Sequence, residues 1–439
     1  MKIFYKLPIL LLLFIPLALS AQKRWSLEEC IRYAWDNNLT IKQQEIAVEQ
    51  SVNNVLQSKL QYVPTFNASV SHSMNWGRSV NMQDLQIIEN KLSQSTSASM
   101  RASINLFEGF QKENDLKSKK ILYEISLQNV GRIKNQISVE ISRAYLQILL
   151  AKAILQTASQ SMESVKQQSE RTGKLVDAGS IAYSSLLEIQ SQLASERVQV
   201  VNSKNQVNNA ILALKQLLDL TGESDFDIES PDLDLIIVDF SGESVDNLFE
   251  RSKDLPEIKS ARLNLQNSNI QLAIAKGSVY PSLSFSAGYG TYYSDSRETN
   301  FMDQFNENRN PSISFGLSIP VFNNGKTNTA IKNARLGVRS SEIDVRSKEQ
   351  VLYKEIQQAN SDALGYYERY KASSQNVKAM EESFRYVQQK FDLGVLNATD
   401  YTVAKANLFK AQSEYYQSKY QYVFQLKILD FYKGIQITL

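Results

Sequence analysis

The chain has 439 residues, with 48 Lys and Arg against 46 Asp and Glu, one histidine and one cysteine. This balanced charge argues against nucleic acid as a partner, because binding to phosphates requires a basic surplus. A single cysteine excludes an internal disulfide, and a single histidine argues against a catalytic triad or a zinc site.

The first residues have the layout of a secretory signal peptide. Two lysines precede an apolar run over residues 7–19, and small residues follow at positions 20 and 21. The run is shorter than the ~20 residues that a membrane-spanning helix needs. We expect residues 1–21 to be cleaved, which leaves equal numbers of acidic and basic residues. Cys30 lies beyond the new N-terminus, so no lipoprotein is expected, and Cys30 is expected to be a small buried apolar residue.

Residues 22–220 predict a helix, two strands and a long helical hairpin. Ser26 and Glu29 have capping-box spacing at the start of a helix that ends near Tyr62. Alternating polarity predicts strands at about 65–76 and 96–107, with a polar connection over 77–92. The second strand would carry Ala98, Met100, Ala102, Ile104 and Leu106 on one face, and Ser97, Ser99, Arg101, Ser103 and Asn105 on the other. Beyond it the apolar period is helical over about 109–220, with a break near 176–180.

The rest of the chain repeats this order. The acidic segment 221–243 is expected to connect two halves. Residues 244–439 predict a helix with Pro256 near the start of one piece, and strands at about 282–293 and 312–322. A polar loop is expected at 294–310, and a helical hairpin over about 324–433 precedes a C-terminal tail. A constant offset of 215 residues pairs Asp177 with Asp392 and Gly179 with Gly394, which predicts two structural repeats per chain.

The hairpin helices are expected to be very long. No proline occurs between Pro64 and Pro231, so nothing forbids helices of about 60 residues, which would be ~90 Å long. Spacings of three and four alternate in the first long helix and predict a coiled-coil seam with small residues at every other contact. The seam comprises Ile141, Ala144, Ile148, Ala151, Leu155, Ala158, Met162 and Val165.

Four strands cannot close a membrane barrel, since known barrels have at least about eight. Two copies of the chain would give eight strands and a lumen filled by side chains, whereas three copies would give twelve and leave room for water. The apolar strand faces match a lipid-facing band, and the Ser, Asn and Gly faces match a wet lumen. A soluble β-sandwich would need more strands and no helices of this length.

The duplicated order of elements carries a family resemblance. Each half has a helix, a strand pair, a Phe shortly before a Gly, a long helix, a glycine break and a second helix. The Phe and Gly are Phe107 and Gly109 in the first half and Phe322 and Gly325 in the second, and residues 319–322 and 390–394 add short motifs. This order resembles the TolC-type outer-membrane factors of Gram-negative efflux and secretion systems. The resemblance implies a mixed α/β membrane protein: four transmembrane β-strands per chain complete a 12-stranded trimeric β-barrel in the outer membrane, continuous with a long α-helical coiled-coil barrel in the periplasm.

The resemblance also implies a function and partners. The homotrimer would be a passive channel that receives substrates from a periplasmic adaptor (membrane fusion) protein and an inner-membrane pump of RND, ABC or similar type. The functional positions would lie at the hairpin tips, over 175–188 and 391–403. In the family, two acids spaced by three residues line the constriction of the pore. The matching positions here are Asp400 and Val403, and the first tip offers Ser185 and Glu188.

Each tip position has an alternative role. Under threefold symmetry one carboxylate becomes a ring that sets ion preference, but Asp400 is also placed to cap a helix, and Ser185 and Glu188 have capping-box spacing. Gly179 and Gly394 are expected first to end helices in a left-handed conformation and second to lie where an adaptor docks.

The closed state in the family resembles a latch, in which a tyrosine and an arginine of the second tip bond a carboxylate of the first. Phe391, Leu396 and Ser185 occupy those positions here. None of them can form the charged latch, so packing or another polar set would have to close the tips.

No enzyme activity, cofactor or metal is expected. His72 lies on an alternating strand face without catalytic partners, and the chain lacks a Gly-rich phosphate loop. The main alternative function is a periplasmic coiled-coil adaptor or tether without a membrane barrel. A general diffusion porin would need a whole barrel per chain and no long helices.

Overall fold

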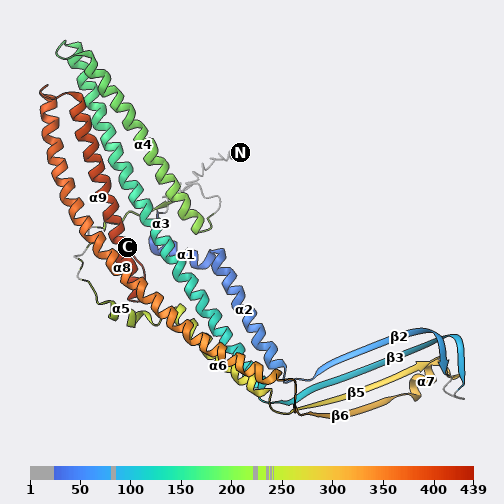
Figure 1. Ribbon diagram of the computed structural model, residues 1–439. Helices are drawn as coiled ribbons and strands as arrows, with labels where there is room; N and C mark the ends of the chain where they lie inside the picture. The colour runs from blue at the N-terminus through green and yellow to red at the C-terminus, as the bar shows by residue number, and fades with distance from the viewer. Residues whose placement is uncertain (1–23, 81–85, 221–225, 234–236, 238–239, 241) are drawn as a thin grey trace, which may run out of the picture.

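The computed structural model describes residues 24–439, apart from 81–85, 221–225, 234–236, 238–239 and 241. The expected signal peptide lies outside the described residues, and so does part of the expected connector at 221–243. The described chain is elongated, with a β-sheet at one end and the tips of two helical hairpins at the other (Figure 1).

The first helical segment is divided in two. Ser26 and Glu29 form the expected capping box at the start of α1 (Leu27–Asn37). The prediction of one continuous helix that ends near Tyr62 is wrong, because Asn38 separates α1 from α2 (Leu39–Leu60). The Asn38 side chain accepts a hydrogen bond from the N–H of Thr40 and donates one to the carbonyl of Leu217, so it caps α2 and holds it against a distant helix end.

Four strands form one antiparallel sheet. Their order is β2 (Thr65–Val80), β3 (Ile87–Glu108), β5 (Ser282–Ser294) and β6 (Asn310–Ser318). β2 and β3 extend beyond the expected ends into the expected connection. β6 ends four residues before the expected 322, because Pro320 cannot donate to a strand ladder. In the single chain, β2 and β6 are open edges.

The register gives the sheet one apolar and one polar face. Phe66 lies opposite Ala102, and Phe285 lies opposite Phe315, with ring centroids 5.1 Å apart. On the other face, three serine pairs of β2 and β3 are hydrogen bonded at 2.7–2.9 Å. These pairs are Ser69–Ser99, Ser71–Ser97 and Ser73–Ser95. The alternation expected through Leu106 ends earlier, because the register shifts after Asn105 and Phe107 lies opposite Leu283.

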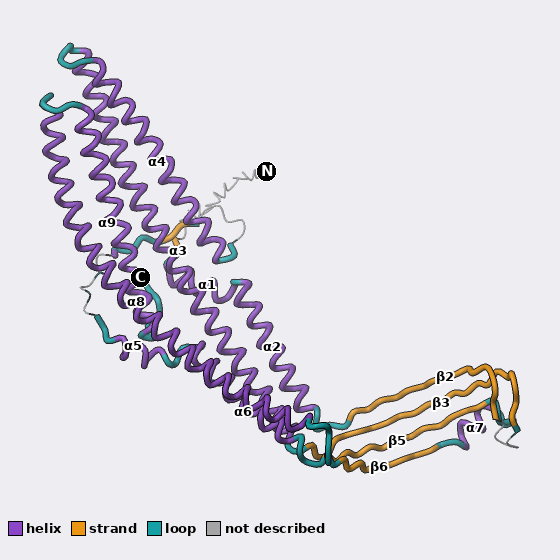
Figure 2. The backbone as a smooth tube through the Cα atoms, viewed as in Figure 1, coloured by secondary structure: helices purple, strands orange, loops and turns teal. Residues whose placement is uncertain are grey.

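The polar loop expected at 294–310 contains a helix, α7 (Phe301–Glu307), which corrects that expectation. Asn300 caps it by accepting a hydrogen bond from the N–H of Asp303. The buried side chain of Gln304 bonds both backbone groups of Ser294, which fixes α7 to the end of β5. Figure 2 shows α7 at the end of the sheet that lies away from the long helices. A seven-residue helix is too short for an apolar period to reveal it.

Two hairpins of equal dimensions make up most of the helical part. α3 (Gln111–Asp177) and α8 (Lys326–Asp392) each have 67 residues, and are ~100 Å long. Their partners α4 (Tyr183–Leu217) and α9 (Ala398–Tyr432) each have 35 residues. α2 and α6 (Pro256–Gly277) have 22 each, and Pro256 occupies the first turn of α6, after the short α5 (Val245–Ser252). Along the expected seam, five side chains are buried: Ile141, Ile148, Ala151, Ala158 and Val165.

Two glycines bring the sheet against the helices. Gly109 has φ +60° between β3 and α3, and a Cβ there would lie 2.2 Å from the carbonyl oxygen of Gly277. A Cβ on Gly277 would in turn lie 2.5 Å from the carbonyl oxygen of Gly109. The two backbones are in contact where the sheet ends, so both positions require glycine.

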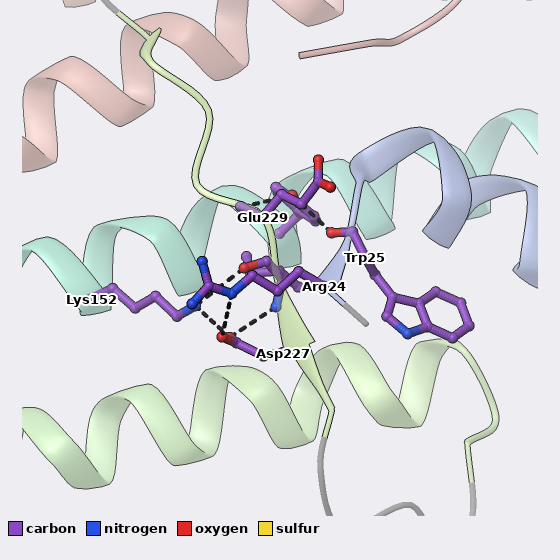
Figure 3. A network of polar contacts seen from close by, with 7 residues as sticks. Arg24, Trp25, Lys152, Asp227 and Glu229 are labelled. Atoms are coloured by element: carbon purple, nitrogen blue, oxygen red, sulfur yellow. Dashed lines mark hydrogen bonds and ion pairs between the residues drawn. The ribbon is translucent and has the colours of Figure 1, made fainter. Parts of the chain in front are cut away.

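The main core lies at mid-length, where both ends of the described chain converge. The two-residue strands β1 (Arg24–Trp25) and β4 (Asp227–Ile228) pair in parallel. The Tyr145 hydroxyl donates to the carbonyls of Trp25 and Glu229, and Lys152 lies 2.5 Å from the Asp227 carboxylate (Figure 3). Burial opposes ionisation of Asp227, but its bonds to Lys152 and to the N–H of Ile228 hold its pKa below the usual value.

Cys30 is fully buried in this core, as expected. Burial raises the pKa of its thiol to about 12, with the nearby acidic side chains acting in the same direction. The thiol is therefore inert and contributes only packing.

Candidate functional site at the hairpin tips

Both long helices end in the same backbone motif. Gly179 (φ +67°) donates its N–H to the carbonyl of Val176, and Gly394 (φ +73°) donates to that of Phe391, both at 2.9 Å. A Cβ on either glycine would meet nothing within 4 Å. The left-handed conformation alone therefore favours glycine, which confirms the structural role expected for these residues.

Neither capping role expected for the tip residues is found. α9 is capped by Asn397, whose side-chain oxygen accepts a hydrogen bond of 2.8 Å from the N–H of Asp400. α4 begins at Tyr183 without a side-chain cap, so Ser185 already lies in its first turn. Asp400 and Glu188 are left as exposed carboxylates. Asp400 lies in the first turn of α9, where the helix dipole stabilises its negative charge. Val403 is exposed one turn after Asp400, and Ser185 is half-buried.

An apolar cluster joins the two hairpins just behind the tips. Val165 of α3, Ile189 of α4, Phe384 of α8, and Ala398 and Tyr401 of α9 are buried together. The Tyr401 ring is stacked on Phe391, with centroids 4.9 Å apart. Phe391 is thus a packing residue, and Leu396 is half-buried in the turn beside it. Burial raises the pKa of Tyr401, while the hydroxyl of Ser164 acts in the opposite direction.

A buried lysine extends this cluster. Lys405 is only 7 % exposed, and its ammonium lies 5.0 Å from the ring centroid of Phe384. Burial lowers the pKa of Lys405, and the nearby Glu196 on α4 opposes that shift. Glu196 is itself buried and accepts a hydrogen bond of 2.8 Å from Gln192. The sequence carried a signal for this residue, because Lys405 occupies an apolar position of the α9 pattern, four residues after Tyr401 and three before Leu408.

An ion pair also joins the hairpins. The Arg171 guanidinium on α3 lies 3.0 Å from the carboxylate of Asp392, the last residue of α8. Sequence reasoning missed this pair because the two residues are far apart in the chain and neither occupies a latch position of the family. The ion pair supplies a polar contact between tips that Phe391, Leu396 and Ser185 cannot make.

The described residues offer little for catalysis or metal binding. They contain no group of three or more His, Cys, Asp or Glu side chains that could hold a metal ion. His72 is exposed on β2, with Nδ1 2.9 Å from the Thr96 hydroxyl. None of the helices within the described ranges is long and apolar enough to cross a membrane.

Comparisons with known proteins agree with this architecture. The model of the outer membrane efflux protein family matches residues 30–219 and 251–434. The outer membrane protein TolC of Vibrio cholerae is 20 % identical over 288 residues, which are 65 % of this chain and 64 % of that protein. The chain thus spans just under two thirds of this relative.

Solved structures share the fold. A crystal structure of CusC has a TM-score of 0.78 at 18 % identity and covers 94 % of this chain and 92 % of its own. The CmeC outer membrane channel of Campylobacter jejuni has a TM-score of 0.75 at 17 % identity. The match covers 94 % of this chain and 87 % of the CmeC chain. Since the family model matches well over half of the residues, in both halves of the chain, the protein belongs to the outer membrane efflux protein family.

Proposed function

We propose that three copies of this chain form a passive outer-membrane channel, the outer part of a tripartite efflux or type I secretion system. The single observation that carries the proposal is the two-faced, four-stranded sheet with two open edges, joined directly to two hairpins about 100 Å long. Residues 1–21 would be the signal peptide that exports the chain. The equal lengths of corresponding helices support two repeats of one unit.

The open edges support a closed ring. Unpaired strand edges demand partners, and β2 and β6 lie on opposite sides of the sheet. The helical layer has matching exposed apolar residues on its two outer helices. These are Leu39, Ile46, Val52, Leu56 and Leu60 on α2, and Leu336, Ile343 and Val351 on α8. Different surfaces that meet head to tail generate a ring, and three copies supply twelve strands.

The faces of the sheet set its orientation. Phe66, Val70 and Ile313 on the apolar face are each more than 70 % exposed in the single chain, which is unfavourable in water and suits lipid. The serine-rich face then lines a wet lumen. A periplasmic adaptor or tether would have no use for such an apolar face, which makes that alternative the weaker one.

At the other end, the hairpin tips would form the periplasmic entrance. Asp400 and Glu188, with Val403 and Ser185 beside them, would line the constriction, where threefold symmetry turns each exposed carboxylate into a ring. The turns at Gly179 and Gly394 project beyond the packed cluster and would contact the adaptor, which links the channel to an inner-membrane pump. The Arg171–Asp392 pair, with Phe391 and Leu396 packed behind it, would hold the tips together. The protein would not be an enzyme.

Fractionation followed by conductance measurement tests this proposal. The mature chain should appear in the outer-membrane fraction as a trimer and produce conducting channels in planar bilayers. A soluble periplasmic monomer would contradict the channel and favour the tether.

A further inference from the structure

Over the register positions 93–105 of β3, the polar face of the sheet carries one charge amid neutral side chains. Arg101 of β3 lies in register with Asn67 of β2, with Gly288 of β5 and, through it, with Ser312 of β6. The polar-face positions registered with 93–105 of β3 are otherwise Ser, Thr, Asn, Gly or Tyr. Arg101 is therefore the sole charged residue in this described part of the face.

The surroundings leave the guanidinium free. Arg101 is exposed, and no carboxylate pairs with it among the described residues. Across the strand, Gly288 and Gly290 have no side chains that could cover it, and a Cβ on Gly288 would already lie 2.9 Å from the Ser312 hydroxyl. The row is thus built from small residues that keep an arginine side chain uncovered. An unpaired cation on a strand face has no structural role in packing that sheet.

We propose that Arg101, repeated three times around the barrel lumen, forms a ring of positive charge that favours anionic over cationic cargo. The inference rests on the proposed trimeric channel. Twelve strands about 4.8 Å apart and tilted by about 40° give a backbone radius of about 12 Å. Each guanidinium extends inward from that wall, so the axis lies within about one Debye length (about 8 Å at physiological ionic strength) of all three charges.

The ring would act in series with the carboxylates at the tips. Rings of acidic side chains favour cations and rings of arginine or lysine favour anions. The tip rings lie on helices about 100 Å from the sheet, many Debye lengths away, so they do not cancel the field of Arg101. The part of the barrel around Arg101 is therefore the anion-selective section of the duct.

The test is the reversal potential of trimeric channels in a KCl gradient. Three charges about one Debye length from the axis change the anion-to-cation permeability ratio by roughly fivefold, so Arg101→Gln should lower that ratio by about this factor. Arg101→Lys should retain it, because the charge is kept. Asn67→Gln in the same row is the matched control for lumen size and should leave the ratio unchanged.

A second measurement uses the unaltered protein. Raising the salt from 0.1 M to 1 M shortens the Debye length from about 10 Å to about 3 Å, so the contribution of Arg101 to selectivity should vanish. Conducting Arg101→Gln channels with an unchanged permeability ratio would overturn the ring and leave the channel standing. An unaltered protein that forms no channels would instead overturn the proposed function.

Discussion

Lys405 places a positive charge within the contact between the two hairpins. Its pKa is lowered by burial from the usual 10.5. Between the lowered value and 10.5 the unfolded chain binds more protons than the folded one, so stability rises with pH in that window. The contribution of Lys405 to the stability of the tip is therefore least favourable at pH values below its lowered pKa, where the buried amine is protonated.

Replacing this lysine by methionine tests that cost. Lys405→Met alone would leave the nearby Glu196 carboxylate buried without its counter-charge, so it is combined with Glu196→Gln. Removal of both buried charges at similar volume should stabilise the solubilised protein at pH 7 by about 1–2 kcal/mol. The gain over the unaltered protein should shrink as pH rises toward 10.5. Thermal unfolding from pH 7 to 10.5 measures it, with the exposed Lys410→Met on the same helix as control. A gain that is the same at every pH would show that burial of charge is not its cause.

Asp400 is an exposed carboxylate at the tip of the second hairpin. Its backbone N–H is bonded to Asn397 and its side chain is left free of a capping role, so its charge faces solvent. Asp400→Asn should lower the cation preference of single channels with little effect on stability, because the cap belongs to Asn397. The matched variant Asn397→Ala should leave the cation preference unchanged and should lower helix stability by about 1 kcal/mol, because it removes the cap. Unchanged cation preference in Asp400→Asn would remove this residue from the pore lining.

The contact between Gly109 and Gly277 fixes how the sheet joins the helices. Gly277→Ala would force a Cβ to within 2.5 Å of a backbone oxygen, and overpacking of this kind costs about 1–3 kcal/mol. Gly337→Ala on α8 is the matched control, because nothing lies within 4 Å of its Cβ and alanine favours a helix by up to about 1 kcal/mol. Thermal unfolding should move in opposite directions for the two variants. Equal shifts of the unfolding temperature in the two variants would mean that the backbones at Gly109 and Gly277 can move apart without loss of stability.

The elements that could be predicted from the sequence are those in which a periodic apolar pattern continues over many residues. Alternation over ten residues located the strands, and a sustained helical period located hairpins whose helices reach 67 residues. Elements decided by single side chains were missed. Asn38 divides the first helix through its contact with Leu217, and Asn300 caps the short α7. Both depend on one hydrogen bond to a partner that a periodic pattern does not specify.

The tip residues show the same limit. The positions of both tips followed from the glycine breaks and their offset, because a left-handed residue is a local requirement. The contacts across the tips did not follow, since Arg171 and Asp392, or Lys405 and Glu196, meet only after four helices pack together. Helix packing therefore decides which charges at the tips are exposed and which are paired.

At the scale of the whole molecule, the apolar sheet face and the two outer helices present large apolar side chains to solvent in the single chain. Ile343 on α8 is 58 % exposed, so its replacement should not disturb the fold of the protomer. If this surface meets α2 of the next copy, Ile343→Glu buries an unpaired carboxylate at the interface and should shift the trimer toward monomer, whereas Ile343→Val should not. Light scattering in detergent measures the mass of the assembly. A stable Ile343→Glu trimer would place this helix face outside the interface and would leave closure of the ring to the strand edges alone.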